Sequence, residues 1–187
     1  MALSGSTAVV GAYGQNSYTG AAYVFTGSGG TWTQRAELTA ADGAPGEAFG
    51  ISVAVSRSTA VVGAYGKNSY TGAAYVFTGS GATWTQRAKL TAGDAAAHDQ
   101  FGYSAAIYGS TVVVGAPFKN NWAGAAYVYT GSGTSWPQQA KLTAADTAQG
   151  DAFGSAVALS GSTMVVGAPA KNTGTGAAYV FSGSGGA

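Results

Sequence analysis

The chain contains no cysteine, and this absence removes two classes of structure at once. No disulfide can form, and no metal site can be built from thiolates. Its 187 residues are still enough for one domain with a sizeable apolar core, which needs no covalent cross-links. The lack of cysteine therefore leaves the cellular compartment open.

Charge of one sign and long apolar runs are also missing. Eight Lys and Arg face seven Asp and Glu, a net charge of +1, whereas binding to phosphates needs a clustered basic surface. We therefore expect no nucleic-acid partner. No run of about 18 apolar residues is present, so no membrane insertion is expected. No signal peptide is recognisable in the sequence. The 46% of apolar residues follow ordered patterns, which predicts a packed fold despite 31 glycines.

An internal repeat organises the whole chain. A Gly-Ala dipeptide recurs every 52 residues without any insertion, and aromatic residues keep the same step. The chain holds about 3.6 such copies, which identifies a repeat architecture. The recurring positions are Gly11, Gly63, Gly115 and Gly167; Trp32, Trp84 and Trp136; Phe49, Phe101 and Phe153; and Tyr23, Tyr75, Tyr127 and Tyr179.

The copies divide a single expected domain, residues 1–187. Their approximate bounds are 1–48, with a truncated first strand, 49–100, 101–152, and 153–187, with its fourth strand missing. Residues 6–39 and 58–91 differ at only three positions, namely Gln15 against Lys67, Gly30 against Ala82, and Glu37 against Lys89. This near-identity suggests a recent duplication or a designed repeat.

Each copy predicts four β-strands joined by short turns. In the third copy the strands are expected at 102–108, 110–116, 124–130 and 135–143, and Gly/Ser turns separate the first strand from the second and the third from the fourth. Four antiparallel strands at a period near 50 residues are typical of a β-propeller blade, so the predicted fold is an all-β propeller. A β-helix is the alternative, but its rungs are far shorter.

The apolar pattern predicts the radial order of the strands. Residues 59–64 are continuously apolar after Thr59, as expected for an interior strand covered on both faces. In residues 84–91 apolar or amide side chains alternate with polar ones, which predicts an outer strand with one wet face. The Trp of each fourth strand is interpreted as a packing residue between blades rather than as a stacking platform for a ligand.

The segment from Phe101 to Tyr129 resembles the FG-GAP repeat of integrin α-subunit propellers and their bacterial relatives. Its FG is Phe101-Gly102 and its GAP is Gly115-Ala116-Pro117; Phe153-Gly154 and Gly167-Ala168-Pro169 match equally. Phe49-Gly50 keeps the FG, while Tyr13 and Tyr65 replace the GAP proline. The resemblance implies a propeller that recognises a ligand or mediates adhesion, at an extracellular or cell-surface location.

One departure from the resembling family concerns calcium. Integrin-type repeats often carry an Asp-rich calcium loop between the first and second strands, but here those turns read SGST, SRST, YGST and SGST. Turns without carboxylates cannot supply the six to eight oxygens that calcium takes. We therefore expect no metal and no cofactor.

The acids recur in phase in the loops between the fourth strand and the next first strand. They form the pairs Asp42 and Glu47, Asp94 and Asp99, and Asp146 and Asp151. A residue required once per blade indicates turn and cap chemistry rather than an asymmetric catalytic pair. His98 is the single histidine, it lies in one of these loops, and no GxSxG motif accompanies it. We therefore predict that the chain is not an enzyme.

The loops between the second and third strands carry the candidate binding residues. An aromatic residue occupies one phase in three copies, beside an asparagine that recurs in phase; the candidates are Tyr18, Tyr70, Trp122, Asn16, Asn68 and Asn120. A flat apolar ring beside an amide is typical of a sugar or peptide contact. The alternative is that the aromatic side chains fold back and pack over the blade edge. The change from Tyr to Trp to Gly174 across regular copies favours a surface role.

Two functions follow from these patterns. The first is a non-enzymatic recognition or adhesion module whose repeated loops bind a carbohydrate or protein ligand. The second is a structural scaffold that assembles with itself, because incomplete terminal blades leave open strand edges. We expect a homo-oligomer formed through those terminal blades.

Overall fold

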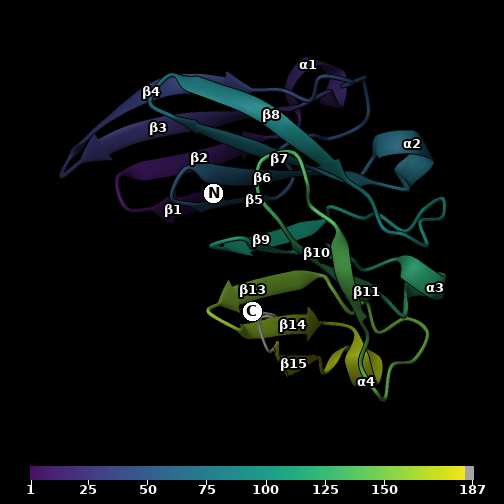
Figure 1. Ribbon diagram of the computed structural model, residues 1–187. Coiled ribbons are helices and arrows are strands. Elements are labelled where there is room, and N and C mark those ends of the chain that lie inside the picture. The colour runs from purple at the N-terminus through teal and green to yellow at the C-terminus, as the bar shows by residue number, and fades with distance from the viewer. Residues whose placement is uncertain (184–187) are drawn as a thin grey trace.

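The computed structural model describes residues 1–183 and contains four antiparallel sheets, one for each copy of the repeat (Figure 1). We call these sheets blades 1 to 4. The strands are, in blade 1, β1 (Ala2–Ser4), β2 (Thr7–Ala12), β3 (Ala21–Ser28) and β4 (Thr31–Leu38); in blade 2, β5 (Val53–Ser56), β6 (Thr59–Ala64), β7 (Ala73–Ser80) and β8 (Thr83–Leu90); in blade 3, β9 (Ser104–Tyr108), β10 (Thr111–Ala116), β11 (Ala125–Thr130) and β12 (Gln138–Leu142); and in blade 4, β13 (Ala156–Ser160), β14 (Thr163–Ala168) and β15 (Ala177–Ser182).

The blades are arranged as in a propeller, as the sequence predicted. Within each blade the strands pair in chain order, and the first strands lie side by side along the axis, β1 next to β5, β5 next to β9, and β9 next to β13. The interior position of the second strand is confirmed, because Val61 and Val62 of β6 are fully buried. In the described residues blade 4 has three strands, so β15 lies at a sheet edge.

Each blade has two apolar faces, which we name by their neighbours. The leading face points to the preceding blade and the trailing face to the following one. In blade 2 the leading face includes Val62 and Phe77, which pack with Val24 of blade 1. The trailing face includes Val61 and Val76, which pack with blade 3. Alternation along the strands therefore places successive apolar side chains in two different interfaces.

Glycine is required where the FG and Gly-Ala motifs of adjacent blades meet. A Cβ atom built on Gly115 of blade 3 would lie 2.0 Å from the carbonyl oxygen of Gly154 in blade 4, and Gly63 has an equivalent contact with Gly102. The Phe of each FG motif fills the interface below this contact; Phe101 is fully buried against Tyr127 and Tyr129. The two motifs thus set how closely neighbouring blades approach.

The outer strand differs from the predicted simple alternation, because it contains a β-bulge. In β8 the register shifts opposite Val76 and Phe77. Trp84, before the bulge, packs with the blade 1 interface, while Leu90, after it, packs with the blade 3 interface. A bulge inserts one extra residue and so redirects the side chains that follow it. One outer strand therefore serves both interfaces of its blade.

The packing role predicted for tryptophan is confirmed in two blades and wrong in the first. Trp136 is buried and Trp84 is half-buried in the interfaces, but Trp32 is 41% exposed. The reason is its neighbourhood: the leading face of blade 1, to which Trp32 belongs, has no blade in front of it in the described structure.

No helix among residues 1–183 is long and apolar enough to cross a membrane. The helical segments are four single turns, α1 (Gln15–Tyr18), α2 (Lys67–Tyr70), α3 (Lys119–Trp122) and α4 (Lys171–Gly174), each in the loop between the second and third strands. Apolar periodicity did not predict them, because four residues are too few to show a helical period.

Candidate functional site

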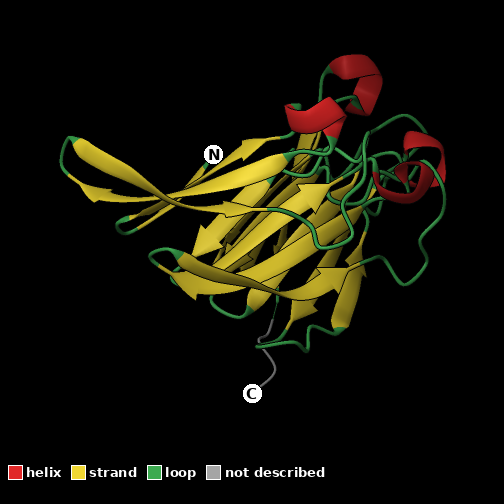
Figure 2. Cartoon of the chain, turned by 90° about the horizontal axis from the view of Figure 1, so that it is seen from above, coloured by secondary structure: helices red, strands yellow, loops and turns green. Residues whose placement is uncertain are grey.

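The four single turns gather at one end of the strands (Figure 2). The loops that join one blade to the next reach the same end, because Ala48 donates its backbone N–H to the carbonyl of Tyr18 at 2.7 Å. Gln100 and Ala152 make the same bond to Tyr70 and Trp122. We call this end, formed by both sets of loops, the loop face.

The backbone of these turns is held in an unusual conformation. Three successive residues of each turn have positive φ, and the aromatic residue is the third: φ is 62° at Tyr18, 63° at Tyr70 and 69° at Trp122. Bulky L-residues rarely adopt this left-handed region, and they persist there only when surrounding contacts impose it. A backbone bond within the turn, such as Gly124 N–H to the Lys119 carbonyl at 2.9 Å, recurs in all four turns, and the loop before the next blade adds a second bond in the first three. The aromatic side chains are therefore presented from a fixed backbone.

Aromatic rings form a continuous band across blades 2 and 3 on the loop face. Neighbouring ring centroids lie 6.0 Å apart from Tyr70 to Tyr65, 6.0 Å from Tyr65 to Tyr103, 6.2 Å from Tyr103 to Phe118 and 4.1 Å from Phe118 to Trp122. Three of the rings are substantially exposed, at 43% for Tyr70, 39% for Tyr103 and 53% for Trp122. We call these five residues the aromatic band.

A second aromatic pair lies in blade 1, and the single histidine extends the band. Tyr13 and Tyr18 pair at 6.3 Å, and the His98 ring stacks on Tyr70 at 6.0 Å with an interplanar angle of 17°. Burial raises the pKa of the Tyr65 hydroxyl, and the nearby tyrosines of blades 1 to 3 raise it further. Of the predicted rings, Tyr70 and Trp122 therefore belong to the aromatic band, and Tyr18 forms a separate pair with Tyr13 in blade 1.

The recurring asparagines have a structural reason to be in phase. Asn16, Asn68 and Asn120 are exposed and open the left-handed stretch of each turn, with φ near 50°. Asparagine tolerates this conformation better than most residues. Asn172 occupies the same position in α4, where Gly174 replaces the aromatic residue. The amide side chains thus lie on the loop face beside the rings, and the left-handed backbone conformation at these positions itself favours asparagine.

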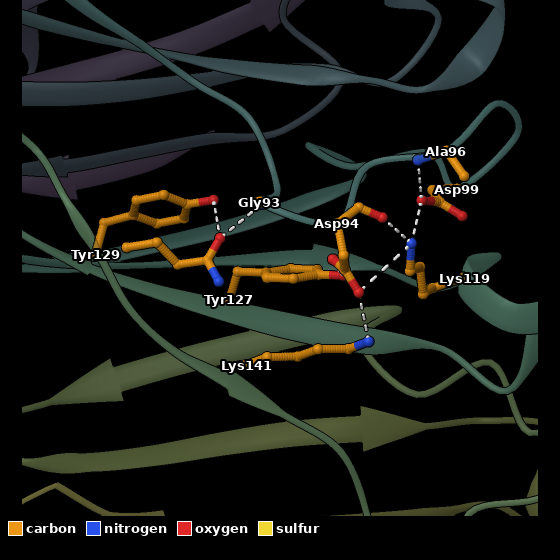
Figure 3. Close-up of polar contacts among 9 residues, drawn as sticks. Gly93, Asp94, Ala96, Asp99, Lys119, Tyr127, Tyr129 and Lys141 are labelled. Atoms are coloured by element: carbon orange, nitrogen blue, oxygen red, sulfur yellow. Dashed lines mark hydrogen bonds and ion pairs between the residues drawn. The ribbon is translucent and has the colours of Figure 1, made fainter.

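In blades 2, 3 and 4 a lysine closes on the acids of the preceding loop, and Figure 3 shows the set of blade 3. Lys119 Nζ lies 2.8 Å from Asp99 Oδ2, also donates to the backbone carbonyl of Asp94, and lies 3.6 Å from the Asp94 carboxylate. Lys141 and the Tyr127 hydroxyl both donate to Asp94 at 2.7 Å. The same set recurs as Lys67, Lys89, Tyr75, Asp42 and Glu47, and in blade 4 as Lys171, Tyr179, Asp146 and Asp151. We call each set a lysine clasp.

The clasp also settles the role of the second acid of each loop. Asp99 accepts the backbone N–H of Ala96 at 2.7 Å, and Asp151 does the same for Ala148. The predicted turn-capping role is therefore confirmed for these acids, and the lysine is an additional partner. Asp99 and Lys119 are both nearly buried, at 7% and 6% side-chain exposure, so each charge depends on the other.

The clasp shifts the ionisation of its members. Burial alone would raise the pKa of Asp94, but hydrogen bonds from Lys141 and Tyr127 and the nearby lysine charges outweigh it and lower that pKa to about 2. Asp42 shifts in the same direction for the same reasons. Burial and the bonded carboxylate raise the pKa values of Tyr75 and Tyr127 well above the usual range. The carboxylates are thus held ionised and occupied by internal partners.

Blade 1 lacks the clasp lysines. Gln15 stands where blade 2 has Lys67, and Glu37 stands where it has Lys89. The Tyr23 hydroxyl donates to Gln15 at 2.6 Å instead of to a carboxylate. Two of the three differences between the first copies thus fall on clasp positions, at the blade with no described neighbour in front.

The FG-GAP repeat family model matches residues 32–77, 84–129 and 136–181. The chain belongs to the FG-GAP repeat family. Each matched segment begins on or just before the outer strand of one blade and ends on the third strand of the next, so it spans one junction between blades. No curated protein matches the chain. FG-GAP propellers are generally non-catalytic repeat modules.

Two features of the FG-GAP site were missed from the sequence. The lysine clasp was signalled by Lys67, Lys119 and Lys171, which recur in phase with the acids, but their pairing depends on how adjacent blades dock. The aromatic band includes Tyr103, which replaces Ile51 and Ser155 of other copies and so left no periodic signal. Comparison of copies for an unmatched aromatic residue could have found it.

Proposed function

We propose that this FG-GAP chain is a non-enzymatic recognition module that binds an extended, uncharged carbohydrate on its loop face. The observation that carries the proposal is the aromatic band. Flat apolar rings with polar neighbours suit the apolar faces of sugar rings, and exposed Asn68, Asn120 and Asn121 provide amides beside the band. An extracellular or cell-surface location accompanies this proposal, on the strength of the family.

Charge on the loop face argues for a neutral ligand. All five lysines of the chain lie in clasps, where they already face carboxylates. A sulfated or acidic glycan would therefore have to compete with internal ion pairs. The fixed left-handed turns reduce the cost of ordering the rings on binding, which supports affinity from preorganisation.

The direct test is an array of neutral oligosaccharides of increasing length, followed by calorimetry. Binding should strengthen with length while the ligand continues to cover further rings, and acidic glycans should bind no better. The variant with Tyr18, Tyr70 and Trp122 all changed to Ala should lose most of the affinity. Tyr108→Ala is the matched control, because Tyr108 is 54% exposed but ends β9 at the hairpin end of the strands. A folded triple variant that binds undiminished would refute the site.

A protein ligand is the alternative occupant of the same face, and a peptide array with the same variants tests it. The second candidate function is a structural scaffold without a ligand. The specific observation that favours it is the exposed leading face of blade 1, where Leu3 is 59% exposed and Trp32 41% exposed. If no array ligand is found and the chain only associates with itself, the scaffold is the better account.

A further inference from the structure

Two blade faces that are buried elsewhere in the chain are open at its ends. The leading face of blade 1 forms an apolar hollow lined by Met1, Leu3, Ala8, Val10, Phe25 and Trp32. The trailing face of blade 4 exposes Val180 to 70%, whereas its counterparts Val24 and Val76 are fully buried. Isolated exposed apolar residues are ordinary, but a contiguous apolar face of this kind marks an interaction surface.

The chain itself shows what covers each of these faces. The leading face of blade 2 carries Ala60, Val62, Phe77 and Trp84, which are identical to Ala8, Val10, Phe25 and Trp32 of blade 1. Those blade 2 residues are covered by the trailing face of blade 1, with Val9, Ala22 and Val24. Blade 4 repeats that trailing set as Val165, Ala178 and Val180. The two open faces are therefore the two halves of an interface that the chain already forms internally.

Steric room at the glycine contact agrees with this pairing. Gly11, Gly63 and Gly115 each press against a carbonyl of the next blade, but the nearest neighbour of a Cβ on Gly167 lies 3.6 Å away, within its own blade. In one molecule the open faces do not meet, because blades 1 and 4 lie at opposite ends of the fan of sheets (Figure 1). A second copy of the chain offers a surface that fits each open face.

We propose that the trailing face of blade 4 in one copy packs on the leading face of blade 1 in a second copy, so that the chains associate head to tail. Such a heterologous contact closes into a ring or extends, according to the rotation it imposes. The contact is weaker than an internal junction, because the described blade 4 lacks the outer strand that provides Leu38, Leu90 and Leu142 elsewhere. It is also independent of the ligand, since both faces lie apart from the loop face.

The copy-to-copy junction contains no lysine clasp. Blade 1 presents Gln15 and Glu37 in place of the two lysines, so ion pairs do not contribute to this contact. Association should therefore rest on apolar burial and change little between low and moderate salt.

Sedimentation velocity of the 187-residue chain across a wide concentration range tests the proposal. The weight-average mass should rise above that of one chain with increasing concentration. Leu3→Glu and Val180→Glu should each weaken association by at least about tenfold, because each buries an unpaired charge in the contact. Both side chains are largely exposed in one molecule, so the variants should stay folded, and circular dichroism with urea unfolding verifies this. Tyr108→Glu, outside both faces, is the matched control.

Mixing the two variants decides the geometry. Leu3→Glu keeps an intact blade 4 face and Val180→Glu keeps an intact blade 1 face, so the equimolar mixture should form a dimer that goes no further. A wild-type chain that stays monomeric at every concentration overturns the proposal. So does a mixture that fails to dimerise, or association that only one of the two variants weakens, because the latter indicates contact between identical faces.

Discussion

Blades 1 and 2 have nearly the same sequence but very different environments. Phe77 is 3% exposed and Phe25 only half-buried, and the Tyr75 ring is fully buried while Tyr23 is not. The covalent chain around these pairs is identical. The difference shows that burial in this protein is a property of the junction between blades, not of the repeat itself.

The sharpest test of this comparison uses glycines at equivalent positions. Gly115→Ala should destabilise the chain by about 5 kcal/mol or more, at the upper end for single substitutions, because its Cβ would overlap the Gly154 carbonyl. Gly167→Ala should cost under about 1 kcal/mol, since nothing lies close. Urea unfolding of both variants measures the difference. Equal losses would mean that the backbone, and not the neighbouring blade, requires glycine.

The phenylalanine pair gives a smaller contrast. Phe77→Ala should lower the free energy of unfolding by about 3–5 kcal/mol, because it empties a packed interface. Phe25→Ala should lower it by only about 1 kcal/mol, since its ring is already partly in water. The measurement belongs at low protein concentration, where association between copies does not contribute. A loss at Phe25 as large as that at Phe77 would contradict the open face.

Exchange of the clasp residues tests the same comparison electrostatically. Lys67→Gln copies the blade 1 residue into blade 2 and should cost about 3 kcal/mol, because it leaves Glu47 nearly buried without its cation. Gln15→Lys should change stability by less than about 0.5 kcal/mol, since no acid loop precedes blade 1 in the described structure and Glu37, at the second clasp position, is exposed. Thermal unfolding of both variants at neutral pH measures the contrast, and a large gain from Gln15→Lys would reveal an acid loop in front of blade 1.

The clasp also predicts a pH dependence with a definite sign. Because the folded pKa of Asp94 is depressed to about 2, its contribution to stability is complete above about pH 4 and is lost as the pH falls toward 2. The Lys141→Met variant should show a flatter loss of stability over this window, because the Lys141 hydrogen bond is the largest of the effects that lower the pKa of Asp94. If stability falls in parallel with pH in the wild type and the variant, the ion pairs make no pH-dependent contribution to stability.

Removal of metal is expected to have the smallest effect. The turns between first and second strands carry no carboxylate, and the loop acids already hold lysines. A chelator should leave the melting temperature unchanged. If chelator lowers the melting temperature and calcium restores it, the loop acids bind a metal ion.

More of the architecture than of the candidate site could be predicted from the sequence. A 52-residue period, continuous apolar second strands and Gly/Ser turns are local signals, so the four-stranded blades and the ring of Phe and Gly motifs could be expected. The exposed positions of Tyr18, Tyr70 and Trp122 were expected as well. The alternation of residues 84–91 gave no hint of the bulge that sends Trp84 and Leu90 to opposite interfaces.

What could not be predicted depends on contacts between copies of the repeat. Lys119 and Asp99 are 20 residues apart in the chain and meet only because two blades dock. Tyr65 follows β6 of blade 2 and Tyr103 precedes β9 of blade 3, and their rings, 6.0 Å apart, come together only where the two blades pack. The residue pattern within one repeat contains no information on contacts between side chains of different repeats.

The loop turns have a consequence for how this protein can change. Their shape is held by main-chain bonds, such as that from Gly124 to Lys119, which recur in all four turns and involve no side chain at the tip. The same turn accordingly accepts Tyr, Trp and, in α4, Gly174. Within the limit set by the left-handed backbone, the tip residue can therefore change without loss of these bonds, so the loop face can vary from blade to blade while the framework that carries it stays constant.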